Sequence, residues 1–294
     1  MKNVRLAAVA VILATVAAIV PAAAQSPWSK TVITPPGSYY TITAGAELGF
    51  IKVLINTIQI GTGGSTFNYV TQGGEEILFP YTRYSVDLSL AKRNHIIFVY
   101  QPLLLQTQTV VPAGQSFTID STTFAAGTPV NVTYSFPFWR VSYLYDFVDT
   151  RNWIFGAGAS LQLRNASIRF ENGAGTQLTV SQNLGIVPIL KVHARYQSDG
   201  GFFVQSTVDG FYASSALFNG ANFQFEGSIL DASLQTGVAL TNGAEAFIGA
   251  RFIGGTASGT SQYTNANGAW TNSISGYTNN ALATLAVTLG ARIH

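Results

Sequence analysis

Two long neighbouring segments of the chain alternate apolar residues with small or polar ones, and a short polar turn joins them. They cover residues 130–148 and 153–170, and the turn is residues 149–152, Asp-Thr-Arg-Asn. Alternation with a period of two predicts β-strands, and the residues between them are typical of turns. Strands of globular proteins usually have about 5–6 residues. Segments this long therefore indicate an unusual environment.

The same pattern recurs along most of the chain and predicts an all-β fold of about ten strands, with eight to twelve consistent with it. The continuation of the first strand to residue 60 is apolar without clean alternation, and its state is left open. The expected strands are residues 39–51, 79–91, 95–109, 130–148, 153–170, 177–197, 202–212, 226–240, 244–253 and 281–293.

The connections between these segments alternate in length. Tight turns are expected near Lys92, Asp149, Ser198 and Thr241. Thr241 is followed by the Asn-Gly pair that two-residue hairpins favour. Longer connections are expected near residues 61, 110, 172, 213 and 254. Short turns on one side and long loops on the other are typical of a transmembrane antiparallel up-and-down β-barrel. A secreted β-sandwich also alternates apolar with polar residues, but it gives no reason for this alternation of loop lengths.

The first residues predict export. A basic start is followed by an apolar run over residues 6–20, and Ala22-Ala23-Ala24 then fits the small-x-small pattern of signal peptidase. The run is shorter than the roughly 20 residues of a membrane-spanning helix, which disfavours the alternative of an uncleaved anchor. We expect a signal peptide at 1–24 cleaved after Ala24, a periplasmic lead-in at 25–38 and a barrel at 39–294.

Composition agrees with a membrane barrel. Charged residues are 10% of the chain, against about 25% in ordinary globular proteins. The chain has no cysteine, so no disulfide framework can stabilise it after export. The net charge of +2 falls to zero when the leader, with Lys2 and Arg5, is removed. This balance argues against nucleic acid as a partner.

Aromatic residues flank both ends of the expected strands and form the two girdles of a membrane barrel. Tyr145 and Trp153 lie beside the Asp149 turn, and Tyr134 and Phe138 lie toward the long loops. With the leader and the alternating last strand at 281–293, they make the chain resemble the Gram-negative outer-membrane β-barrel proteins. The resemblance implies residence in the outer membrane among lipid and lipopolysaccharide, and assembly by the barrel-insertion machinery. It covers nearly all of the mature chain and carries no active site. Strands of that class commonly end in an aromatic residue, whereas this chain ends in Ile293-His294.

The alternation assigns charges of both signs to the inner face of the barrel. Such charges must pair in a narrow lumen, because an unpaired ion removed from water is costly. They form either a structural network that fills the lumen or the filter of a narrow, porin-like path for a small solute. The expected lumen charge network is Glu47, Arg83, Asp87, Arg140, Asp146, Arg164, Lys191, His193, Arg195, Asp209, Asp231, Glu245, Arg251 and Arg292.

Three function classes follow from this pattern. The first is a narrow transport barrel or a structural barrel with a charge-paired lumen. The second is a ligand-binding or adhesion barrel that acts through its long loops, such as the uncharged loop expected at 254–280. The third is an outer-membrane hydrolase. The three histidines, His95, His193 and His294, do not lie in the expected long loops, and His193 is followed by Ala194-Arg195 without a serine. We expect no catalytic residue, metal or cofactor.

Overall fold

The computed structural model describes residue 34 and residues 38–61, 63–214, 225–240, 243–260, 262–264, 270–272 and 277–294. Every regular element in this part of the chain is a β-strand. No helix in it is long and apolar enough to cross a membrane. The expected leader with its cleavage site and the turn residues Thr241 and Asn242 lie outside the described residues.

Ten antiparallel strands form a closed barrel, which confirms the predicted fold class. Each strand pairs with the next around the ring, and the pairing of β10 with β11 closes it. In ring order the wall strands are β1 (Tyr40–Ile60), β3 (Leu78–Leu90), β4 (Asn94–Gln101), β9 (Phe138–Asp149), β10 (Trp153–Asn172), β11 (Leu178–Gln197), β12 (Phe202–Ser214), β13 (Phe225–Ala239), β14 (Ala244–Gly259) and β17 (Thr278–Ile293).

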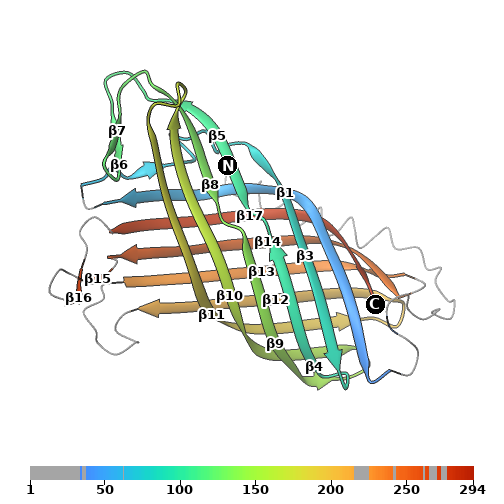
Figure 1. The fold of residues 1–294 in the computed structure, drawn as a ribbon. Coiled ribbons are helices and arrows are strands. Elements are labelled where there is room, and N and C mark those ends of the chain that lie inside the picture. The colour runs from blue at the N-terminus through green and yellow to red at the C-terminus, as the bar shows by residue number, and fades with distance from the viewer. Residues whose placement is uncertain are drawn as a thin grey trace, which may run out of the picture.

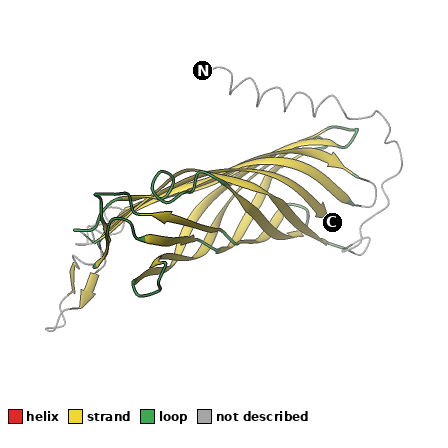
Figure 2. Ribbon diagram, turned by 90° about the horizontal axis from the view of Figure 1, so that it is seen from above, coloured by secondary structure: helices red, strands yellow, loops and turns green. Residues whose placement is uncertain are grey.

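The short connections lie at one end of the barrel, which we call the turn end, and the longer ones at the other, the loop end (Figures 1 and 2). At the loop end the chain forms additional short strands. They are β2 (Phe67–Asn68), β5 (Leu104–Val110), β6 (Phe117–Ile119), β7 (Thr122–Phe124), β8 (Pro129–Ser135), β15 (Gln262–Thr264) and β16 (Trp270–Asn272).

Two of the expected strands are each interrupted by a proline. The strand expected at 95–109 is divided at Pro102 into β4 and β5, and the one expected at 130–148 is divided at Pro137 into β8 and β9. Beyond these prolines β5 pairs with β8, and β8 pairs with β10. The region expected as a plain loop at 110–129 contains the β6–β7 hairpin. The apolar continuation of the first strand is part of β1, with a register shift between Val53 and Ile55.

β5, β8 and the far halves of β10 and β11 form a four-stranded sheet, here called the loop-end sheet. In Figure 1 these strands rise together, while β12, β13, β14, β17 and β1 run in another direction. The ladder between β11 and β12 ends at Leu190 and Gly210, and the ladder between β3 and β4 ends at Tyr84 and Tyr100. The wall is therefore split on both sides of the loop-end sheet.

Proline explains the ends of both ladders. The bond from the Ser198 amide to the Phe202 carbonyl fixes which residues of β11 bond to β12, and they are the even-numbered ones. The next such pair after Leu190–Gly210 would join Pro188 to Tyr212, and proline has no N–H to donate. In β4 the odd-numbered residues bond to β9, as the bond from the Asp146 amide to the Arg93 carbonyl shows, so the even-numbered ones bond to β3. The next such residue after Tyr100 is Pro102, which has no N–H to donate.

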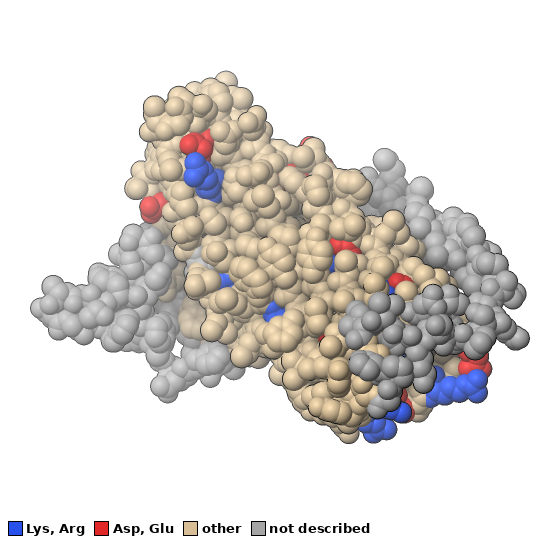
Figure 3. Space-filling model, turned by 45° about the vertical axis from the view of Figure 1, so that its right-hand side comes forward, with Lys and Arg blue, Asp and Glu red and all other residues tan. Residues whose placement is uncertain are grey.

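The outer surface of the barrel is apolar over a broad belt. Leu161, Leu190, Val287 and Leu289 are among its exposed side chains. In Figure 3 uncharged atoms cover most of the visible wall, and the largest groups of charged atoms lie toward the ends of the molecule. An exposed apolar belt around a closed barrel is the surface expected against lipid hydrocarbon.

The interior differs between the two ends. Toward the turn end, charged and polar side chains are buried in the lumen. Toward the loop end the interior is a hydrophobic core, in which Phe170 lies within 5.0–5.8 Å, between ring centroids, of Phe67, Tyr69 and Phe117. Tyr134 and Phe138, which the sequence placed in an aromatic girdle, are buried inside the barrel. Tyr134 belongs to this core, whereas the ring of Phe138 lies beside the guanidinium groups of Arg83 and Arg140.

Candidate functional site

Arg140 lies at the centre of the lumen and links opposite parts of the wall. Its guanidinium Nη1 is 3.0 Å from Asp209 on β12 and 2.9 Å from Asp231 on β13. These strands lie three and four positions from β9 around the ring. The side chain of Arg140 is 1% exposed and that of Asp231 is fully buried. The ion pairs therefore cross the lumen and are shielded from water.

Asp231 receives two further arginines. Its Oδ1 is 2.7 Å from Arg251, and its Oδ2 is 3.3 Å from Arg83. Arg251 in turn donates to Glu47 at 3.0 Å. A single carboxylate cannot neutralise three guanidinium groups. Glu47 and Asp209 are the further acidic side chains that balance this positive charge. We call these buried groups, with Lys191, the central cluster.

Lys191 joins the central cluster from β11. It stands directly opposite Asp209 in the β11–β12 register, with its Nζ 2.7 Å from Asp209 Oδ1. Both side chains are buried. Asp209 thus bridges Lys191 and Arg140 and ties three wall strands together.

Two glutamines complete the bonding of the arginines. Gln162 Oε1 accepts from Nε and Nη2 of Arg140 at 2.9 and 2.6 Å. Gln101 Oε1 accepts from Arg83 at 2.7 Å. Both glutamines are fully buried. Neither glutamine belonged to the expected network, which held charged residues and one histidine only, although Gln162 follows the inward alternation of β10.

A second cluster lies closer to the turn end. Glu245 accepts from Arg195 at 2.7 Å and from Arg292 at 2.9 Å. The guanidinium carbon of Arg195 lies 4.2 Å from the ring centroid of Phe203, and that of Arg292 lies 4.3 Å from the centroid of Phe247. Cation–π contact of this kind stabilises a partly desolvated arginine.

Histidines join this end of the lumen in a way that the sequence did not indicate. His95 bridges Asp87 and Asp146, with a distance of 3.0 Å from Nδ1 to Asp87 Oδ2 and 3.0 Å from Nε2 to Asp146 Oδ2. His294, the last residue, lies 3.3 Å from Glu245. His95 was not part of the expected network, but its side chain points into the lumen from the start of β4.

The remaining two residues of the expected network are less central. His193 Nδ1 lies 3.3 Å from Thr207 Oγ1 on the neighbouring strand. Arg164 lies on β10 toward the loop end, near Tyr134. The structure thus groups the predicted charges into a central cluster and a turn-end cluster, with Arg164 outside both.

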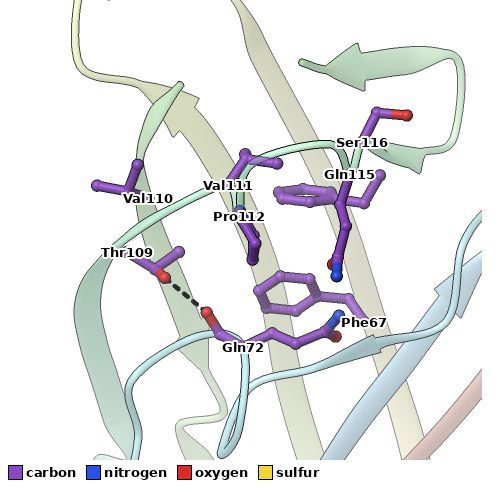
Figure 4. Close-up of a pocket in the computed structure, with 9 residues that line it drawn as sticks. Phe67, Gln72, Thr109, Val110, Val111, Pro112, Gln115 and Ser116 are labelled. Atoms are coloured by element: carbon purple, nitrogen blue, oxygen red, sulfur yellow. Dashed lines mark hydrogen bonds between the residues drawn. The ribbon is translucent and has the colours of Figure 1, made fainter. Parts of the chain in front are cut away.

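The loop end is closed by residues 67–77. Phe67 and Tyr69 fill the core, and Thr109 of β5 donates to the Gln72 carbonyl at 2.6 Å. Figure 4 shows this bond beside a cavity lined by Phe67, Gln72, residues 109–112 and residues 115–117. The cavity volume is about 20 Å³, room for about one water molecule.

One acid lies inside this closure. Glu75 is fully buried, and its Oε2 accepts from Asn56 Nδ2 at 2.9 Å. Its Oε1 has no hydrogen-bond partner among the described residues. Burial raises the pKa of Glu75 from 4.5 to about 7, and the bond from Asn56 only partly offsets this.

No protein-family model and no curated protein matches the chain. Among solved structures, it is similar to the outer membrane protease OmpT from Escherichia coli, with 10% identity and a TM-score of 0.50 over 86% of this chain and 96% of that one. Two more distant matches each cover 86% of this chain. Ail of Yersinia pestis has 5% identity and a TM-score of 0.34 over 99% of its chain, and a Pseudomonas aeruginosa FadL homologue has 8% and 0.33 over 90%.

The architecture is that of the bacterial outer-membrane β-barrels: ten closed antiparallel strands with an apolar outer belt. The similarity to OmpT concerns the fold alone, since the sequences share one residue in ten.

Proposed function

We propose that the protein is an outer-membrane barrel with a closed lumen, which anchors a loop-end sheet at the cell surface and presents it to binding partners. The observation that carries this proposal is the burial of the central cluster. Arg140 reaches across the lumen to Asp209 and Asp231, and Gln162 accepts from its other two nitrogen atoms, Nε and Nη2. A solute path at this level would have to separate buried ion pairs, which is costly.

The length of the strands supports the second half of the proposal. β10 and β11 each have 20 residues, whereas about 9–11 residues cross a bilayer as a tilted strand. On β10 the exposed apolar residues end at Leu163, and Asn165 and Arg169 follow on the same face. The part of β10 that follows Leu163 lies outside the apolar belt. The hydrophobic core at the loop end keeps this part of the strand folded there. A barrel that only filled the membrane would not need this extension.

Reconstitution in planar bilayers tests the closed lumen. The purified full-length protein should give no unitary current steps, because the central cluster blocks the path. A second measurement tests location: fractionation of a Gram-negative host should recover the chain in the outer membrane as a heat-modifiable band. Regular conductance steps would contradict the closed lumen and favour the transport alternative. A soluble periplasmic product would contradict the membrane location.

A further inference from the structure

Among the residues that the structure describes, no strand pairs with the edge of β11 at the loop end. Residues 178–189 pair with β10 on one side, but the ladder to β12 begins only at Leu190. Even-numbered residues of β11 direct their N–H and C=O groups to the β12 side, as the bond from the Ser198 amide to the Phe202 carbonyl shows. The backbone groups of residues 178, 180, 182, 184 and 186 therefore face this open edge. Among described residues, no backbone bond to another element is found for them.

The side chains of this edge are apolar where their neighbours are polar. On the outer face of β10, Asn165, Arg169 and Glu171 lie beyond the apolar belt. Their partners on β11 are Leu184, Val180 and Leu178, respectively. Leu184 is 69% exposed, and Val180 and Leu178 are exposed as well. β11 thus keeps an apolar outer face above the membrane belt, although β10 does not.

The opposite edge of the same sheet is covered. There, Thr109 on β5 binds the Gln72 carbonyl, and the 67–77 segment approaches the Gln108 carbonyl at Gly74. Native sheets usually protect free edges with charge, a bulge or covering chain. Residues 178–189 contain no charged residue. One edge of the sheet is thus closed, and the other has open backbone groups beside exposed apolar side chains.

We propose that residues 178–186 of β11 bind an extended, uncharged peptide strand with alternating apolar side chains, which adds to the loop-end sheet. Backbone hydrogen bonds would hold such a strand, and Val180, Leu184 and Ile186 would contact its apolar side chains. Pro188 sets the lower limit of the site, because it offers no N–H to the strand. This inference rests on the proposed function and gives the chemical class of the partner.

A second barrel in the same membrane does not fit this edge. Antiparallel pairing of two identical edges requires a two-fold axis perpendicular to the sheet. The sheet continues the barrel wall, so such an axis would lie in the membrane plane and turn the second barrel upside down. A free peptide has no such restriction.

The sequence of the edge itself provides a probe. In an antiparallel pair centred on Gln182, Leu178 faces Ile186 and Val180 faces Leu184, so apolar residues oppose apolar ones. Every edge-facing residue in this register has an N–H. A capped, fluorescein-labelled peptide with the sequence of residues 178–186, LTVSQNLGI, is therefore the ligand for the test.

Fluorescence anisotropy with the full-length protein in detergent micelles should show saturable binding of this peptide. Leu184→Pro removes one edge N–H without touching the bonds to β10, and it should weaken binding about tenfold, the effect of one lost hydrogen bond. The matched control is Gln106→Pro, an edge-facing position on the covered edge of the same sheet, which should leave binding unchanged. A peptide with proline in place of its valine should bind more weakly.

Hydrogen exchange gives a second readout that does not depend on a variant. The amides of Val180, Leu184 and Ile186 should exchange quickly in the free protein and slowly with peptide, whereas those of Thr179 and Ser181 should be slow in both. Absence of peptide binding, binding unchanged by Leu184→Pro, edge amides protected without peptide, or protection that depends on protein concentration would each overturn the proposal. A conducting barrel would instead contradict the closed lumen and leave the peptide measurement interpretable.

Discussion

Lys191 and Asp209 face each other on directly opposed residues of β11 and β12, 2.7 Å apart, at the place where the wall begins to split. Only one residue pair, Leu190–Gly210, continues the ladder beyond them. The ion pair therefore joins the two strands at the last position where both still belong to one wall. Asp209 also holds Arg140 at 3.0 Å, so this position is tied to the far side of the lumen.

Replacing Lys191 by methionine should destabilise the barrel. Breaking a buried pair by removing one partner costs roughly 3–5 kcal/mol. We expect the lower end of this range, since Asp209 retains Arg140. The double variant Lys191→Met with Asp209→Leu should recover part of the loss, because Arg140 keeps Asp231. Urea unfolding in lipid vesicles measures the three free energies and the coupling. Additive losses would show that the two side chains do not interact energetically.

The barrel was predictable from sequence because each wall strand must present alternate residues to lipid. This constraint produces a regular alternation of apolar and polar residues over long segments, such as β10 and the final strand β17. The inward charges followed from the same alternation. Their partners across the lumen did not, since the contact between Arg140 and Asp231 depends on how the ring closes and on the length of the side chains.

The loop-end core was missed, although the sequence contains its signal. Before Pro137 the apolar residues Val130, Val132 and Tyr134 have even numbers, and after it Val141 and Tyr143 have odd numbers. The apolar residues change from the inner face to the outer face at that proline. Where a strand crosses the membrane, its outward-facing side chains are apolar. Where the strand extends into water, its inward-facing side chains are the apolar ones. A reversal of this kind therefore marks the edge of the membrane belt.

A charge placed in the outer belt should destabilise the barrel in a bilayer. Leu234 is exposed on the outer face of β13, and Leu234→Arg should cost roughly 2–4 kcal/mol near the midplane. Asn165→Arg is the matched control, since Asn165 is exposed on the outer face of β10 beyond the belt. Unfolding of both variants in vesicles measures the difference. Equal stability would contradict the position of the belt.

Ser233 lies next to Leu234 on the inner face of β13, but Ser233→Arg is not a suitable inward control for Leu234→Arg. Ser233 is only 7% exposed and stands directly opposite Arg251. A second guanidinium there would be buried beside a like charge. This change should therefore also destabilise the barrel, for a reason unrelated to lipid.

The core at the loop end should behave as the interior of a globular protein. Phe170 is fully buried among Phe67, Tyr69 and Phe117. Phe170→Ala should cost about 3–5 kcal/mol through the lost contacts and the cavity left behind. Phe98→Ala is the control, because Phe98 is exposed on the outer belt and leaves no cavity. Urea unfolding compares the two, and an equal, small loss would show that residues 67–77 do not close a packed core.

Stability of the loop end should depend on pH through Glu75. Its pKa is raised from 4.5 to about 7 by burial, so between these values the folded protein binds a proton that the unfolded chain does not. Stability therefore falls as pH rises from about 4.5 to 7, by on the order of 3 kcal/mol. Glu75→Gln should remove this dependence and match the parent protein at low pH. Urea unfolding between pH 4 and 9 tests it, and an unchanged slope in the variant would assign the dependence to another group.

The split between β11 and β12 should close when its proline is replaced. Pro188→Val supplies the N–H that is missing opposite Tyr212, so the ladder can extend by one bonded pair. We expect a stability gain of about 1 kcal/mol and slow hydrogen exchange at the new amide. Pro80→Val on β3 is the control. Its new N–H would face the other split, where β5 has turned away to pair with β8, and should exchange quickly. If the amide at 188 also exchanges quickly, something other than the missing donor separates the two strands.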